Sequence, residues 1–109
     1  MDKEQDKLIV VLVTTPNNEF AEKLSEELVQ SHIAACVNII SNIRSIYCWK
    51  GALEKSKESL LIIKTTIARF KDLEQFIKNK HPYETPEIVS LAAQDVAQGY
   101  LNWVLEATS

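Results

Sequence analysis

The sequence predicts an α+β protein with the ferredoxin-like βαββαβ order, a long β-hairpin and an extra C-terminal helix. Apolar runs of strand length alternate with amphipathic helical stretches in the order strand, helix, strand, strand, helix, strand. Two of these strands follow each other directly around Gly51, one of only two glycines in the chain. Right-handed crossovers then place the first and third strands in the centre of one sheet.

The first strand and the helix after it are predicted from apolar spacing. Leu8–Val13 is a continuous apolar run, as expected of a central strand covered on at least one face. Thr15 and Pro16 predict the start of a helix, with Thr15 as its cap and Pro16 in its first turn. Apolar residues then recur at helical spacing until the helix ends around Ser31 and His32.

The hairpin that follows is too long for its own domain. Its first arm is Ala34–Trp49, and the chain returns through Leu53 to Thr66. At ~3.3 Å per residue the first arm would extend roughly 50 Å. A domain of this size is only about 35 Å across. The arm therefore either breaks at Ser41 and Asn42, or its far end contacts another subunit.

Two features of this hairpin predict an oligomer. Because its tip would extend beyond the domain, we expect Tyr47 and Trp49 to form a subunit interface. Its first arm is also predicted at one edge of the sheet, opposite an edge strand at Glu87–Ala92. An apolar edge strand promotes aggregation unless something covers it.

The rest of the chain predicts two further helices. A second amphipathic helix begins after Thr66 and ends at His81, because Pro82 cannot continue it. After the edge strand, Tyr100 to Leu105 predict a terminal helix that is apolar on two sides and held between other elements.

The composition is that of one globular domain. We expect this domain over residues 8–109, preceded by a charged, flexible tail at residues 1–7. A net charge of −3 predicts neither a nucleic-acid nor an acidic-lipid partner. No apolar run approaches the ~20 residues that span a bilayer. The charged start is not a signal peptide, and with two cysteines it predicts a cytoplasmic location.

The sequence offers few groups for catalysis, and we assign no catalytic residue. It has no Gly-rich phosphate-binding motif, and the loop after the first strand has neither Gly nor Arg. The central strands carry no aromatic side chains for RNA recognition. Cys36 and Cys48 would lie about 40 Å apart on an unbroken strand, so one chain cannot bring them to a shared metal or disulfide.

The segment from His81 to Glu84 gathers an imidazole, a phenol and a carboxylate next to a helix end. Two interpretations stay open: a helix stop in which Tyr83 packs beneath the turn, which the residues alone favour, and a binding loop. Lys64 is the one cation expected to be half-buried on a central strand, so it needs a carboxylate partner. The candidates for that partner are Glu58, Glu84 and Glu87.

Five segments go beyond a general fold pattern. They are Ala34–Asn38, Ser45–Gly51, Leu61–Thr66, His81–Glu87 and Tyr100–Trp103. In this order and spacing they resemble the CutA family of divalent-cation tolerance proteins, over nearly the whole chain. The resemblance implies a ferredoxin-like subunit in a tight homotrimer joined at strand edges. It also implies a likeness to PII signalling proteins, a cytoplasmic location, and a link to tolerance of copper and other divalent ions.

The chain departs from the family at a proposed copper site. In some bacterial members, copper binding has been proposed through a Cys at the end of the first strand and two consecutive His before the Pro. Val13, Lys80 and His81 occupy these positions here. The resemblance therefore implies at most weak Cu²⁺ binding, at His81 with Glu84, and no required cofactor.

Two functions are compatible with this sequence. The first is a non-enzymatic, trimeric CutA-like protein in the response to divalent metal ions. The alternative is a PII-like sensor that binds a small anion or metabolite between subunits, with Lys64, His81 and Tyr83 as binding groups. The pocket is expected at Cys36, Lys64, Tyr83 and Trp103. An acylphosphatase-like enzyme would need an Arg-bearing loop that the chain lacks.

Overall fold

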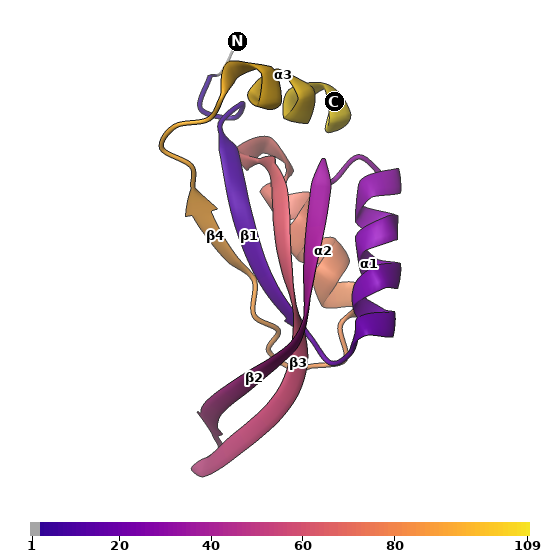
Figure 1. The fold of residues 1–109 in the computed structure, drawn as a ribbon, viewed down its shortest axis with the longest axis vertical. Coiled ribbons are helices and arrows are strands. Elements are labelled where there is room, and N and C mark those ends of the chain that lie inside the picture. Colours follow the sequence, from indigo (N-terminus) through magenta and orange to yellow (C-terminus); the bar gives the residue numbers. More distant parts are fainter. Residues whose placement is uncertain (1–2) are drawn as a thin grey trace.

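The chain folds in the predicted order of elements (Figure 1). The structure is a computed structural model that describes residues 3–109, so Met1 and Asp2 of the predicted tail lie outside the described residues. Its elements are β1 (Leu8–Thr15), α1 (Asn18–Gln30), β2 (Cys36–Trp49), β3 (Ala52–Thr66), the 3₁₀ turn η1 (Ile67–Arg69), α2 (Phe70–Lys80), β4 (Val89–Ala92) and α3 (Gln98–Ala107).

One antiparallel sheet with the strand order β2-β3-β1-β4 organises the described residues. The predicted ferredoxin-like arrangement is confirmed, with β1 and β3 in the centre and β2 and β4 at the edges. Helices α1 and α2 lie on one face of the sheet, whereas α3 lies across one end of it (Figure 1).

The main core lies between the sheet and the helices α1 and α2. Alternate residues of a strand point to opposite faces, so every second residue of β1 and β3 enters this core. Each large side chain buried in this way stabilises the fold by about 1.5–3 kcal/mol. The buried members include Val11 and Val13 of β1, Leu61 and Ile63 of β3, Leu24 and Leu28 of α1, and Leu73 and Ile77 of α2.

The second face of the sheet is covered only at one end. There, Val104 of α3 packs with Leu8 and Ala35. Beyond α3, the strands present apolar side chains that are half-buried or exposed in the single chain, and we call them the open sheet face. Its members are Leu12, Ile40, Leu60, Ile62, Val89 and Leu91.

The hairpin bends and still projects from the domain. The pairing of β2 with β3 shifts between Ile40 and Ile43, and Asn42 between them has φ +59°. The predicted break is thus a β-bulge, which bends a strand without ending it. The part beyond the bulge extends away from the sheet (Figure 1), and the longest dimension is 47 Å against 25 and 23 Å. Lys50 and Gly51, with φ +52° and +81°, form the predicted turn.

The start of α1 corrects the prediction. Its N-cap is Asn17 instead of Thr15, and the Asn17 side chain accepts a hydrogen bond of 2.7 Å from the backbone N–H of Phe20. Thr15 is the last residue of β1, where it pairs with Ser59 and its hydroxyl donates to the Ser59 carbonyl. Strand pairing therefore extends further than the apolar run indicated, and Pro16 precedes the helix instead of lying in its first turn.

The terminal helix also differs from the prediction. One side of α3 packs through Val104, which is fully buried, but its other side is not covered within the single chain. Tyr100 and Trp103 stack at 5.6 Å between ring centroids and are 39% and 46% exposed. The expectation that α3 lies between other elements therefore fails within one chain, because none of the described elements covers this side.

The described part of the predicted tail contacts the domain. The carbonyls of Gln5 and Lys7 accept hydrogen bonds from the backbone N–H groups of Ala68 and Ile67 in η1. Within residues 3–109, no helix has the length and hydropathy needed to cross a membrane.

Candidate functional site

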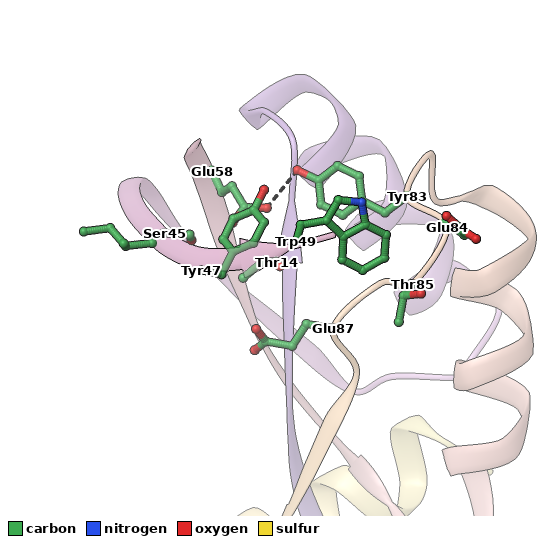
Figure 2. Close-up of a pocket in the computed structure, with 10 residues that line it drawn as sticks. Thr14, Ser45, Tyr47, Trp49, Glu58, Tyr83, Glu84, Thr85 and Glu87 are labelled. Carbon is green, nitrogen blue, oxygen red and sulfur yellow. Dashed lines mark hydrogen bonds between the residues drawn. The ribbon is translucent and has the colours of Figure 1, made fainter. Parts of the chain in front are cut away.

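A cavity of about 580 Å³ lies where the projecting part of the hairpin approaches the loop between α2 and β4 (Figure 2). We call it the hairpin cavity. Its position depends on the bulge, which bends the hairpin, and on the end of α2, which begins the loop. The cavity is lined by residues of β2, β3, the end of β1 and this loop. They include Tyr47, Trp49, Glu58, Tyr83, Glu84 and Glu87.

His81 does not line the cavity, but it holds the loop in place. Its side chain is buried, its Nε2 lies 2.8 Å from the Thr14 carbonyl, and its Nδ1 lies 3.1 Å from the Tyr83 backbone N. Because the N–H of Tyr83 must donate to Nδ1, Nε2 carries the proton and donates to Thr14. The ring also packs against Phe20 at 5.4 Å and Tyr83 at 4.5 Å between centroids. His81 therefore joins α2, β1 and the loop.

Within residues 3–109, a single hydrogen bond connects the loop to the hairpin. The hydroxyl of Tyr83 donates to Oε2 of Glu58 at 2.8 Å, and only 6% of Glu58 is exposed (Figure 2). Burial, the hydrogen bond to Glu58 and the charge of that carboxylate raise the pKa of Tyr83. Tyr83 is therefore a neutral donor at physiological pH. On the other wall, the hydroxyl of Tyr47 lies 3.0 Å from the Ser56 hydroxyl.

The segment from His81 to Glu84 thus contains both of the predicted arrangements. His81 ends α2 and is buried, as in a helix stop, while Tyr83 and Glu84 line a cavity, as in a binding loop. A metal ion at His81 would have to displace one of its two hydrogen bonds. Within residues 3–109, no three side chains of His, Cys, Asp or Glu converge as metal ligands.

The residues of the predicted pocket lie at two places. Cys36 and Lys64 are paired across β2 and β3, with Lys64 Nζ 4.0 Å from Cys36 Sγ. Burial raises the pKa of Tyr100 of α3, and Cys36 makes a smaller electrostatic contribution in the same direction. The ring of Trp103 packs against the ring of Tyr100. Tyr83, by contrast, lines the hairpin cavity.

The distance between the two places follows from the strand register. Glu58, the partner of Tyr83, precedes Lys64 by six residues on β3, or about 20 Å at 3.3 Å per residue. None of the ion pairs formed within residues 3–109 joins Lys64 to Glu58, Glu84 or Glu87. Its described contact is the Cys36 thiol.

Sequence reasoning missed Glu58 and Glu87 as cavity residues and considered them only as partners for Lys64. It placed Tyr47 and Trp49 at the hairpin tip but did not predict that they line a cavity with Tyr83. No local pattern indicates this, because 25 residues separate Tyr83 from Glu58 and the bend of the hairpin brings the two walls together.

Fold and site together define a class: a ferredoxin-like α+β protein with a projecting, bent hairpin and an aromatic, acidic cavity beneath it. The chain matches the model of the CutA1 divalent ion tolerance protein family over residues 9–107, and it belongs to this family.

Individual relatives agree with this assignment. The divalent-cation tolerance protein CutA of Thermus thermophilus is 42% identical over 91% of this chain and 96% of its own length. The chloroplastic protein CutA of Arabidopsis thaliana is 40% identical over 92% of this chain, which spans about half (55%) of that relative. The crystal structure of CutA1 from Oryza sativa superposes with a TM-score of 0.92 at 37% identity, covering 94% of each chain.

The role of His81 can be tested by its removal. The variant His81→Ala should lower the free energy of unfolding by about 1–3 kcal/mol, because the Thr14 carbonyl and the Tyr83 N–H lose a buried partner. Urea unfolding at fixed protein concentration measures the change. The control is His32→Ala, which removes an exposed imidazole that contacts the Ala107 carbonyl. Equal losses in both variants would contradict the structural role of His81.

Proposed function

We propose that this protein acts in tolerance to divalent cations as a non-enzymatic homotrimer in the cytoplasm. Its family membership and the name of the Thermus relative, a divalent-cation tolerance protein, support the link to metal ions. Two free cysteines, Cys36 and Cys48, suit a reducing compartment. The observation that carries the proposal is the open sheet face.

The open sheet face exposes apolar side chains that lie next to one another. Val89, Leu91 and Ile40 are each exposed by more than two fifths in the single chain, next to half-buried Leu12 and Ile62. Contiguous apolar surface of this kind marks an interaction site in a folded protein. Three copies that turn these faces toward a common axis would bury it.

The sheet edges support a closed ring. β2 and β4 lie at opposite edges, and neither is paired on its outer side within the described residues. Joining the β2 edge of one copy to the β4 edge of the next is a head-to-tail contact, which forms a ring when the rotation closes. The projecting hairpin then reaches a neighbour, where Tyr47 and Trp49, each 42% exposed, contribute contacts.

A binding role fits the cavity better than a catalytic one. Its central groups, Tyr83 and Glu58, are hydrogen-bonded to each other, and within residues 3–109 no Ser or Thr hydroxyl of the cavity wall forms a hydrogen bond to a carboxylate or imidazole. The raised pKa of Tyr83 lies far from neutrality, whereas an acid–base catalyst works best with a pKa near the operating pH.

The cavity also bears on the choice between cation and anion. Its wall carries the carboxylates Glu58, Glu84 and Glu87, and none of its ten residues is Lys, Arg or His. Lys64, which an anion sensor of the PII type would use, lies beside Cys36 instead. The cavity therefore argues against the anion-binding alternative, while the proposed role in the metal response rests on the family and its named relatives.

The proposed assembly can be measured directly. Size-exclusion chromatography with light scattering at micromolar concentration should give three times the chain mass of 12.4 kDa. The expected cause is burial of the open sheet face. A stable monomer at this concentration would contradict the proposal.

The hairpin tip should contribute to this assembly. Replacing Trp49 by alanine should weaken the trimer by about 2 kcal/mol per tip, as expected for an aromatic residue central to an interface. Sedimentation velocity over a dilution series measures the loss. Leu53→Ala is the control, because this neighbour on the hairpin is also exposed but smaller. A trimer equally resistant to dilution in Trp49→Ala and wild type would make the tip a free loop.

Copper should bind weakly and depend on His81. Its imidazole, with Glu84, offers one or two ligands, and binding must first break a hydrogen bond. Isothermal titration of chelator-treated protein with Cu²⁺ should therefore show low affinity, lost in His81→Ala, while the trimer persists without metal. Tight stoichiometric binding that survives His81→Ala would show that other residues hold the ion.

A further inference from the structure

The wall of the hairpin cavity carries negative charge that the described residues do not balance. Glu58, Glu84 and Glu87 contribute carboxylates, and no cationic side chain lines the cavity. None of the ion pairs between residues 3 and 109 includes any of these three side chains. A cation that enters the cavity is therefore attracted by three carboxylates, against the repulsion of the Lys50 ammonium, which lies 5.8 Å from the ring centroid of Trp49.

Glu58 is the buried carboxylate of the cavity wall, so a cationic partner would stabilise it most. Only 6% of Glu58 is exposed. Its one described partner is the neutral hydroxyl of Tyr83, which donates a hydrogen bond to Oε2. Burying a carboxylate without a cationic partner is costly. The second oxygen, Oε1, is not fully enclosed, because the Ser25 hydroxyl is the only fully buried side-chain nitrogen or oxygen without a partner in residues 3–109. Oε1 therefore keeps some exposed surface on a residue that lines the cavity.

Aromatic rings supply the rest of the wall. Tyr47 and Trp49 of β2 and Tyr83 of the loop surround the space next to Glu58 (Figure 2). The face of an aromatic ring attracts ammonium and guanidinium groups, and Trp most strongly. The ring of Trp49 already has one such neighbour, because the Lys50 ammonium lies 5.8 Å from its centroid. The same rings provide apolar surface for a carbon chain.

These features select an organic cation over a metal ion. A divalent metal ion needs several N, O or S ligands at close range, and no group of three converges within residues 3–109. Aromatic rings add no such ligand but suit an alkylated cation. The volume of about 580 Å³ lies in the range of small-molecule sites.

We propose that the hairpin cavity binds a small organic cation, an alkylammonium or alkylguanidinium ion. Its charged group donates hydrogen bonds to Oε1 of Glu58, and its carbon chain lies on Tyr47 and Trp49. The Tyr83 hydroxyl holds Glu58 in position from the other side. This site goes beyond the proposed function, since it requires neither copper nor His81 as a ligand. It does require that the neighbouring subunit, which the proposed function places against the hairpin tip, leaves the cavity side of Tyr47 and Trp49 open.

Binding can be followed on the full chain through the indole N–H of Trp49 in proton–nitrogen correlation spectra. Butylammonium and butylguanidinium, added at constant ionic strength, should each give a saturable shift, whereas neutral n-butanol should not. Glu58→Gln should weaken binding about tenfold or more, because it removes a charge-assisted hydrogen bond. Tyr47→Leu should weaken it about two- to fivefold.

Two further variants keep the test decisive. Glu87→Gln changes an exposed cavity residue and should weaken binding even if Glu58→Gln fails to fold. Glu22→Gln removes an equal charge from the exposed face of α1, away from the cavity, and should leave the affinity unchanged. Equal weakening by Glu22→Gln would reduce the effect to overall charge and overturn the site.

The remaining outcomes also decide against the proposal. An equal response to n-butanol would make the cavity a general apolar pocket, and a Glu58-dependent response to Mg²⁺ would make it a metal site. No saturable shift with either cation would mean that the cavity is closed or filled by a neighbouring subunit. Light scattering on the same samples separates the two ideas: a trimer that does not bind refutes the cation site alone, and a monomer that binds refutes the assembly alone.

Discussion

The pairing of β2 with β3, and the bulge that interrupts it between Ile40 and Ile43, is the constraint on which the rest of the structure depends. On the domain side of the bulge, the two strands belong to the sheet. They contribute Leu61 and Ile63 to the buried core, and the partly buried Val37 and Ile39 pack against it. Beyond the bulge, the same strands leave the sheet and project past the domain. One hairpin therefore contributes both to the core and to a surface that lies outside it. A straight hairpin would not turn Tyr47 toward the loop that carries Tyr83.

The two faces of the sheet differ in how far helices cover them. Helices α1 and α2 bury one face completely enough that Val11, Val13, Leu61 and Ile63 are inaccessible. On the other face α3 is only ten residues long and covers one end. The apolar residues left open there, the two edges that are unpaired within residues 3–109 and the uncovered side of α3 are the features on which we base the proposed contact with further copies of the chain.

The loop after α2 connects this architecture to the candidate site. At the end of α2 its position is fixed by His81, whose two ring nitrogens contact β1 and the loop backbone. Further along the loop it is fixed by the hydrogen bond between Tyr83 and Glu58 of β3. These hydrogen bonds use the imidazole that a metal site would need and leave one carboxylate buried without a cation. The local chemistry thus favours an organic cation in the cavity over a tightly held metal ion.

The sequence by itself determined the order of the elements, the central and edge strands, the turn at Gly51 and the family. These follow from apolar periodicity, crossover handedness and local backbone preference, all of which act over short stretches of chain. For the long first arm the sequence left two outcomes open, a break at Ser41 and Asn42 or contact with another subunit, and the structure has a bulge between Ile40 and Ile43. Only the tertiary structure decided that Tyr83 meets Glu58 while Lys64 meets Cys36. Those contacts depend on strand register and on the bend at the bulge, which join residues far apart in sequence and leave no local pattern.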